Sequence, residues 1–550
     1  MEKSMKRLLL LIILTSITLL YTRPYFLYRY FPTHDGEWAI IRLAEMEREI
    51  KDGQIPPRWS DYLNHGYGYP LFSYTYPFPF YIGAALRIFH IGQVDAIKII
   101  FVTSMLLSAF FMFLLGKELM GNFAGFISAI FYITAGYRFV NLYVRGSIGE
   151  SISFALFPLL FFLGLKYTYK PNILYFILCS LTLAILILSH NIMSLVFFPS
   201  YIVFLIVVSR YYARDIKYYF WRYIMPMIIL GLGLSSFFFL PAIFEKQYIV
   251  LSKMRLSDLD LHFINLSDYL FSSWKFGPIP SFKIGWSHIF AGIISIIGII
   301  TTSKNDKKRC LPVVLYILVM IFISIFLAHP ISSTLWYIPP LSWLDFPWRL
   351  LAPMTFFIAF STVFLSGDKT RELIACFLVV VAVFSGFNLS MPAGYIDRPD
   401  TYYATNDATT TSADELMPVW VINKPGKRYQ TKVEIEDGKA NVENLNYNSK
   451  FIKFKITSES PASVRINTVY FPGWQFMIDQ RKIDIDYRKP DGLMRFQIPS
   501  GNYTVEGHFL NTPVRIVGNT ISFFSFLAVL MFMFFGIWRR IATRCTHYEN

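Results

Sequence analysis

The sequence predicts a polytopic α-helical membrane protein of about twelve spans, with an extracytoplasmic all-β domain near the C-terminus. Three observations lead to this fold class. Only 16% of the 550 residues are charged and 54% are hydrophobic, whereas soluble domains have roughly 25% charged residues. Apolar runs long enough to cross a bilayer recur along most of the chain. Between about 395 and 510 they give way to short alternating segments separated by turns.

The first apolar run follows Lys3, Lys6 and Arg7 and lacks a small-residue cleavage site, so we expect a retained first helix rather than a signal peptide. Twelve spans place both termini on one side of the membrane. The predicted spans are about 8–28, 96–116, 122–138, 151–166, 172–189, 192–209, 221–241, 287–302, 311–328, 349–366, 371–388 and 514–537.

Lysine and arginine cluster in alternate connections between these spans, which by the positive-inside rule are cytoplasmic, together with both termini. The formal net charge of +15 therefore reflects topology, and no nucleic-acid partner is expected. None of the four cysteines falls in a large polar loop, so no disulfide framework is indicated. The predicted outer loops are 29–95, 139–150, 242–286, 329–348 and 389–513.

Three units are predicted: a transmembrane domain at 1–394 with a large first outer loop at 29–95, a β domain at 395–510, and a last helix with a cytoplasmic tail at 511–550. The partly alternating segment 450–456 (KFIKFKI) and turns such as Asp437-Gly438 indicate antiparallel strands. Within this domain the segment 470–474 (YFPGW) offers aromatic rings that can stack on sugars, although a buried turn is the commoner use of such a segment.

Asp35 and Glu37 follow the first span within the segment 33–38 (THDGEW). A carboxylate at the membrane surface can accept a proton from a hydroxyl group or hold a divalent cation. The alternative is helix capping, which the pattern alone favours, because Asp35 precedes an amphipathic run.

Arg145 and Glu150 lie in the segment 145–150 (RGSIGE) at the predicted outer end of the fourth span. Glu150 can act as a second acid or metal ligand and Arg145 can bind phosphate, or the two can form an ion pair that closes the loop. His190 lies between two spans that leave almost no loop. It can bind a phosphate or a sugar hydroxyl, but a hydrogen bond that closes the helix hairpin is favoured.

Asp345 and Arg349 belong to the segment 339–349 (PPLSWLDFPWR) before the tenth span. Arg349 beside several aromatic rings can bind a lipid phosphate while the rings contact the prenyl chain. The alternative is an aromatic belt with a snorkelling arginine. The density of tryptophan and proline favours the functional interpretation. Walker A, dinucleotide-binding, HExxH and CxxC motifs are absent from the sequence, which argues against a nucleotide-driven pump.

The segments HDGEW, GQIPPRW, GYGYPLF, RGSIGES, LSHN and LDFPWR occur in this order over most of the chain. Together they resemble the membrane proteins named as related to 6-pyruvoyl-tetrahydropterin synthase, and nothing in them resembles the soluble, zinc-binding pterin enzyme. The layout is similar to the GT-C glycosyltransferase superfamily, and YFPGW is similar to the C-terminal domain of YfhO-type membrane proteins.

This resemblance implies a membrane glycosyltransferase whose donor is a polyprenyl-phosphate sugar and whose acceptor is a glycan, lipid or protein on the extracytoplasmic face of the cell membrane. No cofactor is certain, although Mg²⁺ or Mn²⁺ bound by Asp35, Glu37 and Glu150 is possible on residue type. A lipid-linked glycan flippase and a non-catalytic assembly factor are the alternatives. The implied catalytic residues are Asp35 and Glu150, and the implied substrate-binding residues are His34, Glu37, Arg58, Tyr69, Arg145, His190, Asp345 and Arg349.

Overall fold

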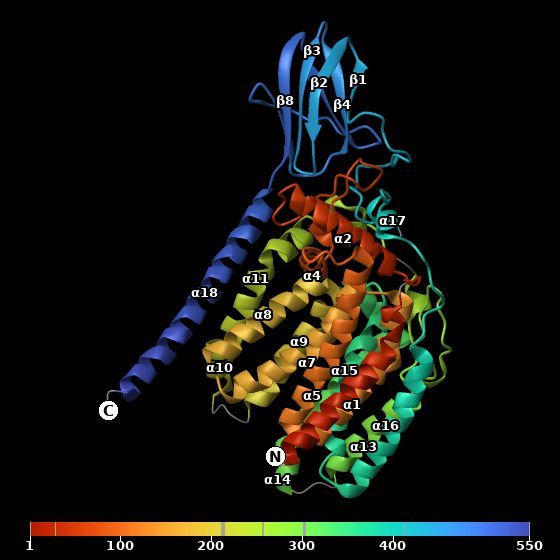
Figure 1. Cartoon of the computed structure of the whole chain (residues 1–550), viewed down its shortest axis with the longest axis vertical. Helices are drawn as coiled ribbons and strands as arrows, with labels where there is room; N and C mark the ends of the chain where they lie inside the picture. The colour runs from red at the N-terminus through yellow and green to blue at the C-terminus, as the bar shows by residue number, and fades with distance from the viewer. Residues whose placement is uncertain are drawn as a thin grey trace.

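A computed structural model describes residues 2–27, 29–210, 215–255, 258–300, 304–411 and 413–548, with the backbone alone at 2–3, 299–300, 304–309 and 535–548. A bundle of long helices carries a β domain at one end (Figure 1). The helices are α1 (Glu2–Tyr21), α2 (Gly36–Lys51), α3 (Leu71–Tyr74), α4 (Phe78–Arg87), α5 (Gln93–Thr134), α6 (Gly136–Phe139), α7 (Ile148–Tyr169), α8 (Ile173–Ser189), α9 (Asn191–Ser209), α10 (Ile216–Tyr219), α11 (Met225–Phe244), α12 (Asp268–Phe271), α13 (Trp286–Ile300), α14 (Lys304–Ala328), α15 (Leu351–Ser361), α16 (Lys369–Leu389), α17 (Asp400–Ala404) and α18 (Pro513–Tyr548).

Nine helical segments of the described residues are long and apolar enough to cross a membrane, and two further apolar helices are shorter. One of the nine, α5, contains two predicted spans, because its backbone leaves helical geometry at Met120 and Gly121. The two arms then pack closely, since a Cβ on Gly125 would lie 2.5 Å from the carbonyl oxygen of Phe113. The polytopic helical class is confirmed, and the count of twelve spans stays a prediction.

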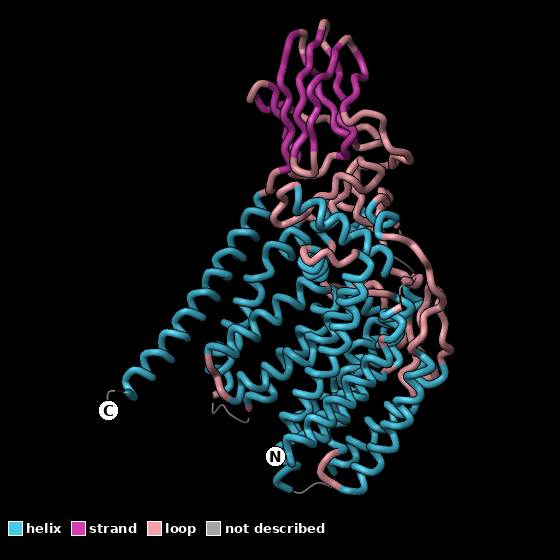
Figure 2. Tube along the Cα trace, viewed as in Figure 1, coloured by secondary structure: helices cyan, strands magenta, loops and turns pink. Residues whose placement is uncertain are grey.

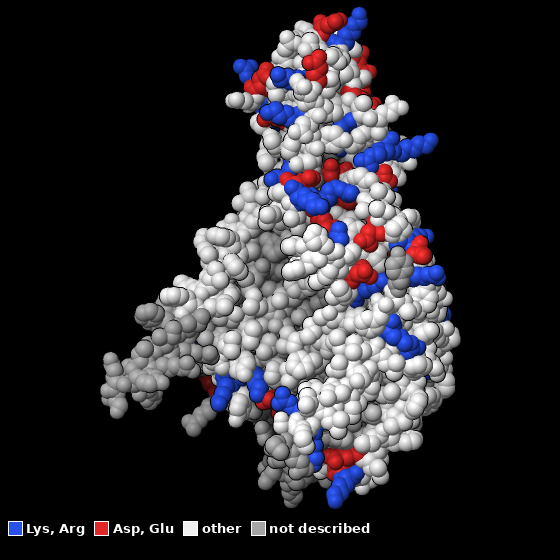
Figure 3. All heavy atoms as spheres, in the orientation of Figure 1, with Lys and Arg blue, Asp and Glu red and all other residues white. Residues whose placement is uncertain are grey.

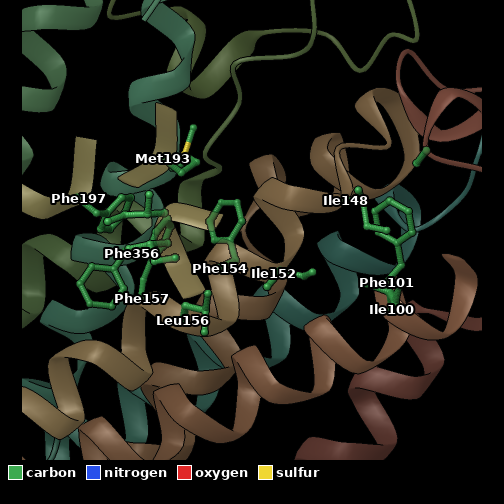
Figure 4. Packing of buried hydrophobic residues seen from close by; sticks show 14 of the residues in the cluster. Ile100, Phe101, Ile148, Ile152, Phe154, Leu156, Phe157, Met193, Phe197 and Phe356 are labelled. Carbon is green, nitrogen blue, oxygen red and sulfur yellow. The ribbon is translucent and has the colours of Figure 1, made fainter. Parts of the chain in front are cut away.

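Helix α7 lies at the centre of the bundle. In its apolar window 89% of the residues are buried, compared with 17% in α18 at the edge. Phe154 and Phe157 of α7 pack with Phe197 of α9 and Phe356 of α15 (Figure 4). Charged side chains gather on the β domain, at its base and at the opposite end of the bundle, and few lie on the visible bundle face between them (Figure 3). This distribution is typical of a protein that spans a membrane.

The β domain consists of two antiparallel sheets (Figure 2). One has the strand order β1-β4-β7 and the other β2-β3-β8-β5-β6. Alternate residues of β3, including Ile452, Phe454 and Ile456, are buried, which is the pattern expected where one face of a sheet meets a core. The strands are β1 (Val433–Asp437), β2 (Ala440–Tyr447), β3 (Phe451–Ser458), β4 (Ala462–Val469), β5 (Trp474–Ile478), β6 (Arg481–Ile483), β7 (Leu493–Ile498) and β8 (Gly501–Phe509).

The strands therefore begin about 40 residues after the predicted start of this domain at 395. The intervening chain includes α17 and runs along the first outer loop: Arg398 pairs with Glu37, and Arg42 donates to the carbonyl oxygen of Thr410 at 2.5 Å. Short helical and extended pieces stabilised by such long-range contacts leave no periodic signal in the sequence.

The first outer loop and the β domain share an aromatic core. Trp59 packs on Phe471 and Trp474, with ring centroids 5.9 and 6.2 Å apart. Gly68 has φ +91° and touches the same indole, because a Cβ there would lie 2.1 Å from Trp59. Phe471 and Trp474 are almost fully buried. The segment 470–474 is therefore the buried turn that was the commoner interpretation, and it fixes the β domain to the loop that also carries α2.

The loops predicted to share the outer side contact one another. Asp35 bonds to the backbone of Arg145, Tyr30 pairs with Ile396, and His34 Nε2 lies 3.1 Å from the carbonyl oxygen of Gly277. The chain ends, at the start of α1 and the end of α18, lie at the opposite end of the bundle (Figure 1). These contacts place the loops at one end, and the assignment of that end to the outside stays a prediction from the basic connections.

Candidate functional site

Asp35 lies directly before α2, but its side chain does not cap the helix. The backbone at Asp35 has φ −119° and ψ −11° instead of the extended conformation usual for an N-cap residue. The hydroxyl of Thr33 instead accepts the hydrogen bond from the amide of Gly36, at 2.9 Å. The capping interpretation is therefore wrong for this carboxylate. Among the described residues Asp35 has no side-chain hydrogen bond or ion pair, and it is half-buried.

The turn that carries Asp35 is fastened to the turn that carries Arg145. The amide of Asp35 donates to the carbonyl oxygen of Arg145 at 2.7 Å, and the amide of His34 donates to that of Val144 at 3.0 Å. Gly146, with φ +63°, allows the close approach, because a Cβ there would lie 2.2 Å from the Thr33 hydroxyl. Residues Val140–Arg145 form a π-helical turn, a rare conformation that is frequent at functional sites.

Glu150 is fully buried at the start of α7, and both of its carboxylate oxygens are occupied. Arg145 forms an ion pair with one oxygen, and the hydroxyl of Tyr137 donates to the other at 2.6 Å. Burial alone would lower the pKa of Arg145, but the charges of Glu150 and Asp35 and the phenol of Tyr137 more than offset it, so the pKa is raised. Burial and the Glu150 charge raise the pKa of Tyr137, so its phenol stays neutral and donates.

His190 joins α8 to α9 and lies against the same region. Its Nδ1 accepts the amide hydrogen of Met193 at 3.2 Å, which is the hairpin-closing hydrogen bond favoured from the sequence. That bond leaves the proton of the neutral imidazole on Nε2. The ring stacks on Tyr76 with a centroid distance of 5.1 Å. Gly149 brings α7 against this junction, because a Cβ there would lie 2.1 Å from the carbonyl oxygen of Ser189.

Arg349 is buried just before α15 and does not snorkel. Its guanidinium donates to the backbone carbonyl of Leu344 and to Asp345 Oδ2, the latter at 3.2 Å, and lies over the Phe346 ring. The Nε atom of Arg349 is buried without a hydrogen-bond partner among the described residues. A buried donor without a partner is costly, which makes it a good point for an anionic group to bind.

These groups form one site, which we call the outer cluster: Asp35, Tyr137, Arg145, Glu150, His190 and Arg349. Glu150, Arg145 and Arg349 all interact electrostatically with His190, and the Arg145 guanidinium lies 4.5 Å from the centroid of the Trp348 ring. The members come from four separate parts of the chain, but each lies at or beside the end of a helix, within the loops predicted to be outside or at their edges. The cluster therefore contains two buried arginines, of which Arg145 pairs with Glu150 and Arg349 pairs with Asp345. It also contains a carboxylate, Asp35, that has no direct partner among the described residues.

Other residues with an implied role lie elsewhere. The carboxylate of Glu37 pairs with Arg398 at 2.7 Å and accepts from Tyr403. The guanidinium of Arg58 donates to the carbonyl oxygen of Phe237 and to Asn519, both at 2.9 Å, and so links α11 to α18.

Tyr69 is buried and bonds to Thr411 at 2.7 Å, beneath the chain that leads to the β domain. His34 lies at the edge of the outer cluster, and burial lowers its pKa. Across the described ranges no three His, Cys, Asp or Glu side chains are placed to hold a metal ion, so Asp35, Glu37 and Glu150 do not form the metal site considered from the sequence. Their partners explain why, because Arg145 and Arg398 already neutralise Glu150 and Glu37.

Tyr137 is the member that sequence reasoning missed. It lies eight residues before Arg145, and the π-helical turn between them brings its hydroxyl 3.2 Å from the Arg145 guanidinium. The available signal was its place at the end of the predicted span 122–138, just before the predicted outer loop 139–150. Nothing in that pattern distinguishes Tyr137 from the other aromatic residues of an interfacial belt.

A small, partly open hollow borders the outer cluster on the side of Asp345; it is called the pocket below. Asp345 has φ +59°, and its carboxylate contacts Arg349 on one side and the pocket on the other. The pocket is lined by Arg255, Leu259, Trp336, Ser342 and Asp345.

The fold and the cluster define a polytopic membrane protein with a buried polar site at one end of its helical bundle. A family model described as "6-pyruvoyl-tetrahydropterin synthase related domain; membrane protein" matches residues 72–395. The chain belongs to this family. An uncharacterised protein of Lactococcus lactis is 23% identical in an alignment 333 residues long, which covers 57% of this chain and 53% of that protein. The chain thus spans about half the length of this curated relative.

Several solved structures have a weak overall likeness to this chain. The mycobacterial arabinofuranosyltransferase AftD has a TM-score of 0.46 at 13% identity, over 70% of this chain and 28% of that one. The Archaeoglobus fulgidus oligosaccharyltransferase AglB, solved with an inhibitory peptide and a dolichol-phosphate, has a TM-score of 0.42 at 14% identity, over 76% and 61%. ArnT from Cupriavidus metallidurans bound to undecaprenyl phosphate has 0.26 at 12%, over 66% and 77%. Scores of this size assign no activity to the chain.

Proposed function

We propose that this protein is a membrane glycosyltransferase that transfers a sugar from a polyprenyl-phosphate donor to an acceptor on the extracytoplasmic side. One observation carries the proposal. Asp35, a carboxylate without a direct partner among the described residues, is joined through its backbone to the turn of the buried Arg145. A second buried arginine, Arg349, interacts electrostatically with Arg145 at the same end of the helical bundle. A base beside a phosphate-binding pair is what transfer from a lipid-linked phosphosugar requires. The similarity of the sequence layout to the GT-C superfamily agrees with this chemistry.

Asp35 acts as the general base in this scheme. Its carboxylate takes the proton of the acceptor hydroxyl, and the acceptor oxygen forms a bond to the anomeric carbon of the sugar. The bond between the anomeric carbon and the phosphate oxygen breaks, and the polyprenyl phosphate leaves with the electron pair. Attack from the face opposite the leaving group inverts the anomeric configuration. The half-buried position of Asp35 supports this role, because the carboxylate is fixed by its backbone and still reachable.

Arg145 and Arg349 stabilise the departing phosphate, and His190 Nε2 donates a further hydrogen bond to it. Glu150 is better placed to hold Arg145 than to take a proton, because its two oxygens already accept hydrogen bonds. We therefore assign Glu150 and Tyr137 as positioning residues. This changes the role of Glu150 from the catalytic acid implied by the resemblance.

Release of lipid phosphate tests the proposed activity. Purified full-length protein in nanodiscs is incubated with a panel of radiolabelled polyprenyl-phosphate sugars and with candidate glycan, lipid and peptide acceptors. We expect at least one donor to yield free polyprenyl phosphate and labelled acceptor in equal amounts. Movement of the intact donor between leaflets without cleavage would identify a flippase and contradict the proposal.

A further inference from the structure

Arg138 is a fully buried arginine in α6, next to Tyr137 in the sequence. Its Nη2 atom donates to the hydroxyl of Ser108 at 3.0 Å and to the sulfur of Met105 at 2.9 Å, both on α5. Its Nε and Nη1 atoms have no hydrogen-bond partner among the described residues, and no carboxylate there contacts the guanidinium. Because arginine stays protonated in proteins, the interior of the helical bundle holds an uncompensated positive charge.

This guanidinium lies close to the outer cluster. It faces the ring of Phe154, 4.2 Å from the ring centroid, and Phe154 follows Glu150 by four residues on α7. Arg138 therefore lies about one helical turn, roughly 5 Å, deeper in the bundle than Glu150. The charges of Arg138 and Glu150 interact electrostatically. An unscreened charge at this depth also acts on other charged groups of the outer cluster, because the effective dielectric constant of a protein interior is low.

The contacts of Arg138 do not explain why this position carries a charge. Charged side chains inside a membrane protein are costly and rare, normally pair with another charge, and mark functional sites. The cation–π contact with Phe154 returns only a part of this cost. Ser108 does not depend on the arginine, because its hydroxyl donates to the carbonyl oxygen of Ser104 at 2.6 Å. A charge that the fold does not need indicates a role in the chemistry of the site.

The two arginines of the outer cluster, in contrast, are each paired with a carboxylate. Arg145 pairs with Glu150, and Arg349 pairs with Asp345. Both guanidiniums can still donate hydrogen bonds to a phosphate, but each pair carries no net charge. Among the buried arginines in this part of the described chain, Arg138 is therefore the one whose charge no carboxylate compensates by direct contact.

We propose that Arg138 stabilises the lipid phosphate as it leaves, through its charge and without direct contact. This inference rests on the proposed function, because it adds a residue to the same reaction. When the bond between the anomeric carbon and the phosphate oxygen breaks, the phosphate changes from a diester with one negative charge to a monoester with about two. Asp35 becomes neutral in the same step, because it takes the proton of the acceptor hydroxyl. The negative charge that the phosphate gains is thus the charge that Arg138 offsets.

Equilibrium binding of three lipids of different charge tests this inference without turnover. The probes are polyprenol, polyprenyl-phosphate-glucose and polyprenyl phosphate, which carry no, one and about two negative charges at pH 8. Each is added to full-length protein in phosphatidylcholine nanodiscs. A unit charge acting over roughly 10 Å at an effective dielectric constant of about 20 changes an affinity by about tenfold for each opposing charge. We therefore expect Arg138→Met to weaken binding of the glucose lipid about tenfold and of polyprenyl phosphate about a hundredfold, and to leave polyprenol binding unchanged.

Thermal unfolding of the same variants separates this role from a structural one. Arg138→Met removes a costly buried charge, so its unfolding temperature should equal or exceed that of the wild type. Arg138→Lys keeps the charge and should recover most of the binding of both phosphate lipids. Arg222→Met is the matched control and should change no affinity. It is the same substitution at an exposed arginine between α10 and α11, at the opposite end of the bundle (Figure 1).

The pattern of the losses decides between the outcomes. Equal affinities of wild type and Arg138→Met for polyprenyl phosphate would overturn the inference, and so would the same loss for the diester and the monoester. An equal loss for all three lipids would assign Arg138 a structural role and would also overturn it. Charge-dependent binding through Arg138 in a protein that transfers no sugar would keep the role of Arg138 and reject the proposed activity. Full turnover by Arg138→Met would do the reverse.

Discussion

Replacement of Asp35 by asparagine should lower the turnover number by roughly 10²–10⁴-fold, the usual contribution of a positioned general base. Asparagine has nearly the same size but cannot accept a proton at neutral pH. Because the Asp35 side chain caps no helix and binds no partner among the described residues, its replacement should leave the fold and donor binding intact. The measurement is the initial rate of polyprenyl-phosphate release, together with the thermal unfolding temperature of each variant.

Asp397→Asn is the matched control for this experiment. Asp397 is an exposed carboxylate in the same region, and among the described residues its one ion pair is a long one, with Arg29 at 3.8 Å. Surface pairs of this kind contribute little to stability, so the control should keep both activity and unfolding temperature. Near-normal turnover by Asp35→Asn would remove Asp35 from the mechanism. Equal losses in the two variants would show that the assay reports a general effect of outer charge.

Replacement of Glu150 by glutamine should destabilise the protein and abolish turnover together. The substitution leaves Arg145 as a buried charge without its carboxylate, and breaking one partner of a buried pair typically costs about 3–5 kcal/mol. We expect a drop of several degrees in the unfolding temperature, measured by tryptophan fluorescence in detergent.

A double variant separates the effect of Glu150 on stability from the role of Arg145 in binding the phosphate. Arg145→Met combined with Glu150→Gln removes both charges, and replacing a buried pair by apolar groups is often neutral for stability. The double variant should therefore regain much of the lost unfolding temperature but remain inactive, because the phosphate would lose one of its two arginines. An active double variant would contradict the role given to Arg145. An unchanged unfolding temperature in Glu150→Gln would contradict the importance of the pair.

The membrane class and the β region were predictable because they depend on local patterns. Apolar runs of span length and the alternation in β3 are each decided by neighbouring residues. The location of Asp35, Glu150, His190 and Arg349 at the same end of the bundle could also be predicted. The loops rich in lysine and arginine assign one end of each span to the cytoplasmic side. Motifs at the opposite ends of the spans must then lie together at the other end of the bundle.

The individual roles were not predictable, because they depend on contacts between distant parts of the chain. Arg58 and Tyr69 looked like substrate-binding residues of an aromatic outer loop, but Arg58 binds Asn519 and Tyr69 binds Thr411, hundreds of residues away. The sequence favoured Asp35 as the helix cap, but in the structure the Thr33 hydroxyl accepts the hydrogen bond from the amide of Gly36. Tyr137 could not be recognised because a π-helical turn has no sequence pattern of its own.

The most direct test of the account is a structure of the Asp35→Asn variant in nanodiscs with a polyprenyl-phosphate sugar that the wild-type protein turns over. The slow variant should hold the donor intact. We predict that the phosphate lies within hydrogen-bond distance, about 3 Å, of Arg349 or Arg145, with the anomeric carbon facing residue 35. A donor bound with its phosphate at the opposite end of the bundle, or against the β domain away from both arginines, would contradict the central claim.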